Sequence, residues 1–446
     1  MDISRPLDQP RQIGVSSSPR PTTGGIGLLI RGTLGPLAPL QLSCAIVAPN
    51  MPDPLTPEEA KNLLGLCRAG NLYDVEKWMA SGKSLHMPSG IKKTPLAVAI
   101  DLGFHSLVEL LSRHETSQEV KNKGLSDAVT AKRLDLAQLL LENGADIKSI
   151  PLMHAFGTWD PAIIRFFLEK GADAIKGSPF AVAFGEKVRT TLRPYVEYKK
   201  AHPELANELQ EQADRALRHF SHEGDLKWVS LMLWAGANPR TQGPTLDDRL
   251  DNDPECHTTA LREACYQGKL DVLLKLKPDP SRDDLSDLLR CAAFFASVEV
   301  VQYLLRIGAK PNDKESGGCG ALENCFWHLG FGHFDPFGGK RLVSKYDVHG
   351  TLECIQSLTE HGALWRPEGP SQLNSVRQAL CKCEPEVTVE LMKILARNKA
   401  CPEENLEELL DTPRMRAHLS PLGMNLQPAP SGKVRQRRRD SKRAPA

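Results

Sequence analysis

Apolar and polar residues recur along the chain at helical spacing, and the helices that this spacing predicts come in pairs. The stretches 94–111, "TPLAVAIDLGFHSLVELL", and 259–276, "TALREACYQGKLDVLLKL", share one plan. A threonine starts a helix, a leucine and two small residues follow, and a glycine turn leads to a second helix rich in valine and leucine. Residues 62–82 and 214–237 repeat the plan. The pattern predicts an all-α chain of helix-turn-helix units.

The second helices end on glycine, followed by alanine and then a polar residue, at Gly144, Gly171, Gly236 and Gly308. A glycine at this place adopts the left-handed backbone conformation without a steric penalty from a β-carbon. One such ending is ordinary, but the same ending after several Leu-rich helices indicates an internal repeat.

These features resemble the ankyrin repeat family. The run Thr94-Pro95-Leu96, with Ala97 and Ala99 close behind, is similar to the T-P-L-H-x-A signature, although Ala97 replaces its histidine. The Gly-Ala-Asp/Asn endings resemble the end of the second ankyrin helix. The resemblance implies a solenoid in which paired small residues let the first helices of neighbouring repeats pack closely, with short β-turn fingers between repeats.

The glycine spacing agrees with this interpretation. Gly82 and Gly144 are 62 residues apart, and Gly236 and Gly308 are 72 apart. Both distances are close to twice the family period of about 33 residues. We therefore expect nine or ten degenerate helix pairs, beginning near residue 57.

The chain divides into four predicted segments. Residues 1–50 are expected to be disordered or not part of the natural product, with Met51 as the true start, because Thr56 and Pro57 then open the first helix. Residues 51–400 form the predicted solenoid, interrupted by an insertion at 331–350. Residues 401–419 are predicted as a C-terminal capping helix, and 420–446 as a disordered basic tail.

Composition favours a folded protein of the cytoplasm. Charged residues make up 25 % of the chain and hydrophobic residues 41 %. No apolar run reaches the roughly 20 residues that a membrane-spanning helix needs, so we expect no membrane contact. Eleven cysteines form no CxxC pair, which favours a reducing compartment over a disulfide framework.

One cluster has the residue types of a zinc site, with Cys319, Cys325, His328 and His333 in sequence. Its spacing matches no compact zinc finger. In the repeat frame Cys325 falls where Ala264 and Ala292 stand, and Cys67 and Cys265 take the next small position. We therefore favour buried structural cysteines and predict no metal or cofactor.

The nucleotide-binding and hydrolase motifs GxxxxGK[ST], GxGxxG after a strand, GxSxG and HExxH are absent from the sequence. An open array of helix pairs also offers a groove rather than a cleft that excludes water. We predict that the protein is not an enzyme.

Two predicted fingers are candidate contact surfaces for a protein partner. The insertion holds more aromatic side chains than a core requires, which is typical of binding hot spots or of a small local core. The stretch 246–253 is acidic and is interpreted as an exposed finger. The candidate partner-binding residues are Trp327, His328, Phe331, Phe334, Phe337, Asp247, Asp248 and Asp251.

The net charge of +1 is unevenly distributed, because seven Lys/Arg and one Asp stand in 433–443 and leave the rest of the chain acidic. The resemblance implies a protein-binding scaffold, monomeric, that binds its partner through the concave groove and fingers of the solenoid. The alternative is a nucleic-acid-associated adaptor anchored weakly by the tail. Its candidate phosphate contacts are Arg435, Arg437, Arg438 and Arg439.

Overall fold

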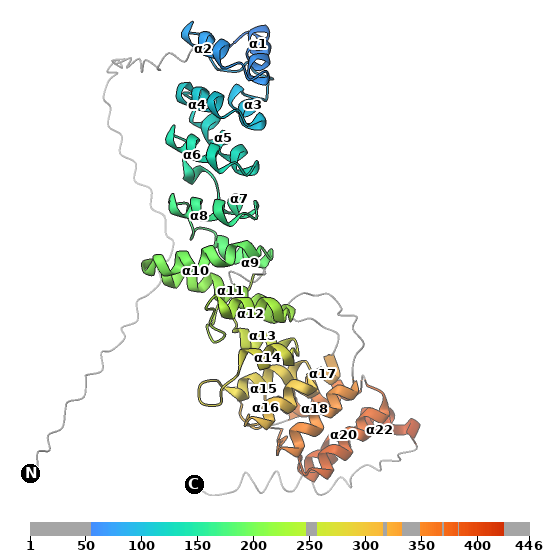
Figure 1. The fold of residues 1–446 in the computed structure, drawn as a ribbon. Helices are drawn as coiled ribbons and strands as arrows, with labels where there is room; N and C mark the ends of the chain where they lie inside the picture. The colour runs from blue at the N-terminus through green and yellow to red at the C-terminus, as the bar shows by residue number, and fades with distance from the viewer. Residues whose placement is uncertain are drawn as a thin grey trace, which may run out of the picture. The chain divides into compact units, whose positions relative to one another are not determined.

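The computed structural model describes residues 55–246, 257–314, 319–331, 348–367, 370–381 and 383–422. Within these ranges the chain is all-α, and its one β-feature is an isolated antiparallel bridge between Gly243 and Thr258. Helices alternate along the chain as the first and second members of helix-turn-helix units, which stack into an ankyrin-like solenoid (Figure 1).

The first helices of the units pack against one another in chain order, from α1 on α3 to α19 on α21. They are α1 (Pro57–Arg68), α3 (Pro95–Leu102), α5 (Gln118–Thr130), α7 (Leu152–Phe156), α9 (Pro179–Gly185), α11 (Ala206–Glu223), α13 (Ala260–Tyr266), α15 (Leu285–Phe294), α17 (Ala321–Phe331), α19 (Pro370–Leu380) and α21 (Glu403–Leu410).

The second helices form a parallel layer, in which α2 contacts α4, α12 contacts α14 and α16 contacts α18. They are α2 (Leu72–Ala80), α4 (His105–His114), α6 (Leu134–Glu142), α8 (Pro161–Glu169), α10 (Leu192–Ala201), α12 (Leu226–Trp234), α14 (Leu270–Leu276), α16 (Val298–Arg306), α18 (Val348–Glu360), α20 (Pro385–Arg397) and α22 (Pro413–Leu419). Short 3₁₀ turns lie at Ile147–Ser149, Arg189–Thr191, Pro203–Leu205 and Ser420–Leu422.

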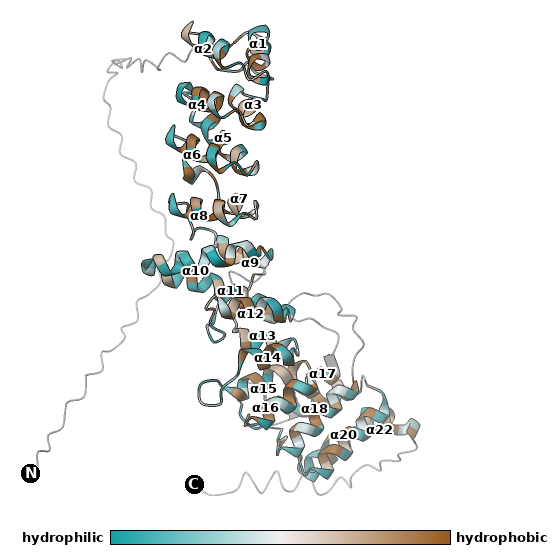
Figure 2. Ribbon diagram, in the orientation of Figure 1, coloured by the Kyte–Doolittle hydropathy of each residue, from teal (hydrophilic) through white to brown (hydrophobic). Residues whose placement is uncertain are grey.

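Small residues allow the first helices to approach closely, as the sequence predicts. In six of these helices a fully buried alanine stands four residues before a left-handed turn residue: Ala99, Ala128, Ala155, Ala183, Ala264 and Ala292. Larger aliphatic side chains fill the space between the two layers, and helices such as α6 and α8 carry both apolar and polar residues (Figure 2). One apolar core therefore continues from unit to unit.

The local signals at helix ends are confirmed. Thr56, Thr94 and Thr259 each cap a first helix by accepting a hydrogen bond from a backbone N–H of its first turn. The glycines that end the second helices, including Gly144 and Gly236, all have positive φ. Because both devices act within a few residues, the sequence alone predicts them.

Helix bounds within two predicted segments differ from what the sequence analysis expects. The capping helix expected over 401–419 is two short helices, α21 and α22, because Thr412 caps a new helix and Pro413 occupies its first position. The segment expected as an insertion, 331–350, overlaps two helices, since α17 extends to Phe331 and α18 begins at Val348.

Candidate functional site

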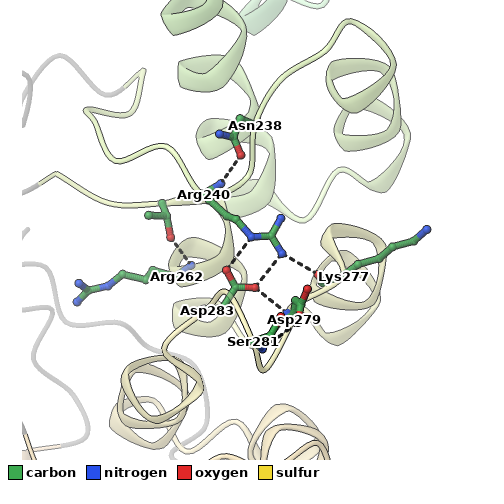
Figure 3. A network of polar contacts seen from close by, with 8 residues as sticks. Asn238, Arg240, Arg262, Lys277, Asp279, Ser281 and Asp283 are labelled. Carbon is green, nitrogen blue, oxygen red and sulfur yellow. Dashed lines mark hydrogen bonds and ion pairs between the residues drawn. The ribbon is translucent and has the colours of Figure 1, made fainter. Parts of the chain in front are cut away.

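The finger that follows α12 is fixed at its root by a buried ion pair. The guanidinium of Arg240 makes two contacts with Asp283, Nε to Oδ1 at 2.7 Å and Nη2 to Oδ2 at 2.9 Å. The Asp283 side chain is only 6 % exposed. Arg240 Nη2 also donates to the carbonyl of Lys277, and Asp283 accepts from the backbone N–H of Asp279 (Figure 3). This network joins the finger to the loop between α14 and α15.

A second arginine, on α11, also binds the backbone of this finger. Arg218, on α11, is 1 % exposed and donates to the carbonyls of Thr241 and Pro244, while its other terminal nitrogen pairs with Glu211. Gly243 lies directly over it, and a β-carbon there would come within 2.6 Å of the guanidinium. The finger therefore leaves the solenoid at a fixed position.

Two open cavities lie beside this finger, between the first helices α13 and α15. One, of about 450 Å³, extends to the finger after α16, and its polar lining consists of Arg262, Asp284, Ser286, Asp287, Arg290, Asp313 and Lys314. The other, of about 260 Å³, is lined by three of the same residues and also by residues of the finger, including Arg240. Together they form a continuous polar surface.

The formal charges of the larger cavity cancel, but the distances within its ion pairs differ. Asp287 accepts a hydrogen bond from Arg290 at 3.2 Å and forms a longer ion pair with Arg262 at 3.5 Å. Lys314 pairs at 2.7 Å with Glu323. The Arg262 side chain is 41 % exposed, and it points away from the Arg240–Asp283 pair (Figure 3).

The remaining carboxylates of this cavity have hydrogen-bond donors of their own. Asp284 caps α15 and accepts from the backbone N–H groups of Ser286 and Asp287. Asp313 accepts from the Ser286 hydroxyl. Backbone amides at a helix N-terminus stabilise negative charge, so Asp284 is held in place at the start of α15.

An aromatic side chain follows each of the two arginines of the larger cavity by one helical turn. Tyr266 stands four residues after Arg262, and Phe294 four after Arg290. The two rings stack with centroids 6.2 Å apart, and Phe295 approaches Tyr266 at 4.6 Å. Residues four apart share one helix face, so the first-helix face carries charge and aromatic surface side by side.

Trp327 occupies the equivalent place on α17, two residues after buried Cys325, just as Phe294 follows Ala292. It is 43 % exposed. It lines a third cavity of about 210 Å³ between α17 and α19, with Phe326, Trp365, Val376, Ala379 and other residues. We call the surface formed by Arg262, Tyr266, Arg290, Phe294 and Trp327 the arginine–aromatic row.

The predicted contact residues are not brought together as one described site. Trp327 is exposed, whereas His328 is half-buried with Nδ1 2.9 Å from the Thr351 hydroxyl. Phe331 ends α17, and its side chain is outside the described part of the structure. The other predicted residues lie outside the described residues altogether: Phe334, Phe337, Asp247, Asp248, Asp251, Arg435, Arg437, Arg438 and Arg439.

The cysteines of the repeat frame are buried, as the small-residue pattern predicts. Cys67, Cys265, Cys325 and Cys354 are 0 % exposed, whereas Cys319 is exposed. Burial raises the pKa of the Cys67 thiol to about 11. In the described ranges no group of three or more His, Cys, Asp or Glu side chains is placed to hold a metal ion.

Sequence reasoning missed the arginine–aromatic row because arginine and aromatic residues are each unremarkable in a helix. The combined spacing carries information, since Arg-x-x-x-Tyr at 262–266 recurs as Arg-x-x-x-Phe at 290–294, one repeat later. The Arg240–Asp283 pair had no sequence signal, because its members are brought together only by the stacking of units.

Comparisons with known proteins add little to this description. No family model and no curated protein matches the chain. A solved structure, the ankyrin repeat domain of Bcl-3, described as a unique member of the IkappaB protein family, is similar over 58 % of this chain and 91 % of that chain. The identity is 18 % and the TM-score 0.25. The fold assignment rests on the helix pairs of the chain itself. Of the helices that the structure describes, none combines the length and the apolar character needed to cross a membrane.

Proposed function

We propose that this protein is an interaction scaffold that binds a partner protein along the first-helix face of α13, α15 and α17 and the fingers beside it. The arginine–aromatic row is the observation that carries the proposal. It combines aromatic rings and arginines, which are the residue types most enriched at binding hot spots.

The surroundings of the row favour binding without large rearrangement. The finger after α12 is held by Arg240 and Arg218, and the first helices are held by their neighbours. A surface that is already ordered loses little conformational entropy when a partner binds. The cavities beside it are open and polar at one edge, so a partner can meet an aromatic centre and a charged rim together.

The two predicted fingers extend this proposal. The acidic stretch with Asp247, Asp248 and Asp251 follows Thr245, whose carbonyl accepts from Arg215 Nε on α11 at 2.8 Å. The aromatic stretch with Phe334 and Phe337 follows α17, the helix that carries Trp327. Both stretches are joined in the chain to described elements, and we propose them as additional contacts in the same complex.

The test is co-purification of the full chain from a nuclease-treated native lysate at low and high salt, in three forms. Wild type is compared with Trp327→Ala and with the matched control Trp234→Ala, which removes a 58 % exposed tryptophan from α12. We expect a stoichiometric protein that survives high salt and binds Trp327→Ala at least tenfold more weakly, because truncating a hot-spot aromatic costs about 2 kcal/mol or more. Trp234→Ala should bind as wild type does.

The same experiment tests the nucleic-acid alternative, which rests on the basic run 433–443. Association through phosphate contacts weakens steeply with salt. Recovery of nucleic acid alone, at low salt alone, and its loss on deletion of 433–443 would replace the scaffold proposal. Equal retention of a partner by all three tryptophan forms would contradict the assignment of the first-helix face.

A further inference from the structure

We infer that the cavity between α17 and α19 binds one uncharged aromatic side chain of the partner protein as an anchor. The inference rests on the proposed function, because Trp327 forms part of the wall of this cavity. It gives the partner a chemical class.

The wall of the cavity is largely apolar on both sides. α17 contributes Phe326 and Trp327, α19 contributes Val376 and Ala379, and Trp365 lies after α18. Four of these five side chains are buried, whereas Trp327 is 43 % exposed. Trp327 is therefore the apolar part of the wall that a partner can reach most easily. The other lining residues are Cys319, Glu323, Gln372 and Ser375.

The apolar wall is already ordered. The rings of Phe326 and Trp365 meet edge to face, with centroids 5.0 Å apart and an interplanar angle of 72°. The backbone N–H of Trp365 donates to the carbonyl of Ala400 at 2.7 Å, and α17 packs directly on α19. A ligand that enters a cavity of this kind pays little for ordering it.

The size of the cavity selects a single side chain. Its volume is about 210 Å³. An apolar cavity of about 150 Å³ is enough to bind benzene, whereas drug-sized ligands occupy about 300 Å³ or more. Aromatic pairs gain from edge-to-face and offset contacts beyond their buried area, so the three aromatic rings of the wall favour a ring over an aliphatic chain.

The charges around the cavity favour an uncharged group. Of the described lining residues, Glu323 alone carries a charge. Its Oε1 lies 2.7 Å from Lys314 Nζ, and its Oε2 accepts from the backbone N–H of Gly320 at 2.6 Å. Because this ion pair is neutral as a unit, a charged ligand would lose its hydration in the cavity without gaining an unpaired counter-charge. A cation over the Trp327 ring is the alternative occupant.

The experiment titrates the full chain with three small probes of similar size and follows them by fluorine NMR. The probes are 4-fluorobenzyl alcohol, which is uncharged, 4-fluorobenzylamine, which is a cation at neutral pH, and 4-fluorobenzoate, which is an anion. Broadening of the fluorine signal on binding gives an affinity for each probe.

Two variants change the cavity itself. Val376→Phe fills it with a ring, and Trp327→Ala removes its exposed wall. The matched controls are Val182→Phe on α9 and Trp234→Ala on α12, which make the same changes at exposed positions. Thermal melting checks that each variant is folded. Ser375→Leu, at a half-buried lining residue, narrows the cavity if Val376→Phe does not fold.

We expect the wild type to bind the alcohol at least fivefold more tightly than either charged probe. Val376→Phe should weaken binding of the alcohol at least tenfold, because the new ring occupies its place, and Trp327→Ala should weaken it about fivefold. The two control variants should bind it as wild type does. In the co-purification from native lysate, Val376→Phe should also weaken retention of the partner at least tenfold.

The outcomes separate this inference from the proposed function. Equal or tighter binding of the cationic probe, or binding of the alcohol that ignores Val376→Phe and Ser375→Leu, overturns the uncharged aromatic anchor. A partner that depends on Trp327 but is retained by a folded Val376→Phe variant also overturns the anchor and leaves the scaffold in place. Binding of the alcohol in the cavity, with no partner that depends on Trp327, overturns the proposed function and the anchor role together.

Discussion

Single residues at the turn between the two helices of a unit show how the repeat tolerates imperfect sequence. The turn needs one residue with positive φ, and glycine supplies it at Gly70, Gly103, Gly224 and Gly268. Lys132, Trp159, Lys187 and Ala296 occupy the same place with φ between 52° and 59°. An L-residue with a β-carbon in this conformation is strained by about 1–2 kcal/mol, so the stacking of the units imposes it.

We therefore expect Lys132→Gly to stabilise the protein by about 0.5–1 kcal/mol, since glycine removes the strain but adds backbone entropy to the unfolded chain. Lys132→Ala keeps the β-carbon and should change the stability by less than about 0.5 kcal/mol. Urea unfolding followed by circular dichroism measures both. A Lys132→Gly variant no more stable than Lys132→Ala would show that the turn is not strained.

Replacing Gly103 by a residue with a β-carbon is expected to destabilise the protein. Its φ is 72°, and the β-carbon would come within 2.5 Å of an Arg133 guanidinium nitrogen. The capping threonines and the glycine ends were predictable because those signals are local. The four strained turns were not predictable, because they lack the glycine that marks a left-handed residue and depend on packing between units.

Among elements, the finger after α12 shows what holds a connection in place. Its root combines the Arg240–Asp283 ion pair with the carbonyl contacts of buried Arg218. The Asp283 side chain of this pair is buried and the Arg240 side chain is half-buried. Loss of one partner destabilises such a pair because the other charge remains without compensation.

Asp283→Asn is expected to lower the free energy of unfolding by about 2 kcal/mol, because it leaves the half-buried Arg240 guanidinium, 27 % exposed, without its carboxylate partner. The matched control is Glu109→Gln, which breaks the exposed pair with Arg113 on α4 and should cost less than about 0.5 kcal/mol. Equilibrium unfolding in urea of the wild type and the two variants gives both changes in the free energy of unfolding. Similar small losses for the two variants would mean that the finger root contributes no stability.

The elements also show where sequence reasoning ends. Helix pairing, the small inner residues and the buried cysteines follow from periodicity. The break between α21 and α22 was missed although Thr412 and Pro413 mark it. The arginine–aromatic row requires the register between units, which a degenerate sequence does not define.

Across the whole molecule, the described helices make their main contacts within a unit or with the next unit. Stability in such an array is close to a sum over units and their interfaces. Buried thiols occur near both ends of the described solenoid. Burial raises the pKa of Cys67 in α1 and of Cys401 next to α21 to about 11 each.

These thiols predict a loss of stability at alkaline pH. Their pKa is 9.0 without burial and about 11 in the folded protein, so their contribution is fully present below pH 9 and is lost as the pH rises toward 11. Thermal melting between pH 8 and pH 11 should show this decline, and Cys67→Ala should reduce it. Wild-type and Cys67→Ala proteins that lose stability in parallel would contradict the prediction for Cys67.

Because the main contacts of the described helices lie within a unit or with the adjacent unit, they also determine how these helices would respond to mechanical load. A protein whose two ends are tied through a common core resists pulling until the core breaks at once. Here a terminal unit can detach while its inner neighbours keep their own interfaces, and the released segment lengthens the tether by one unit. A stretched molecule would therefore lengthen in successive steps and regain its length by adding units back to the remaining stack.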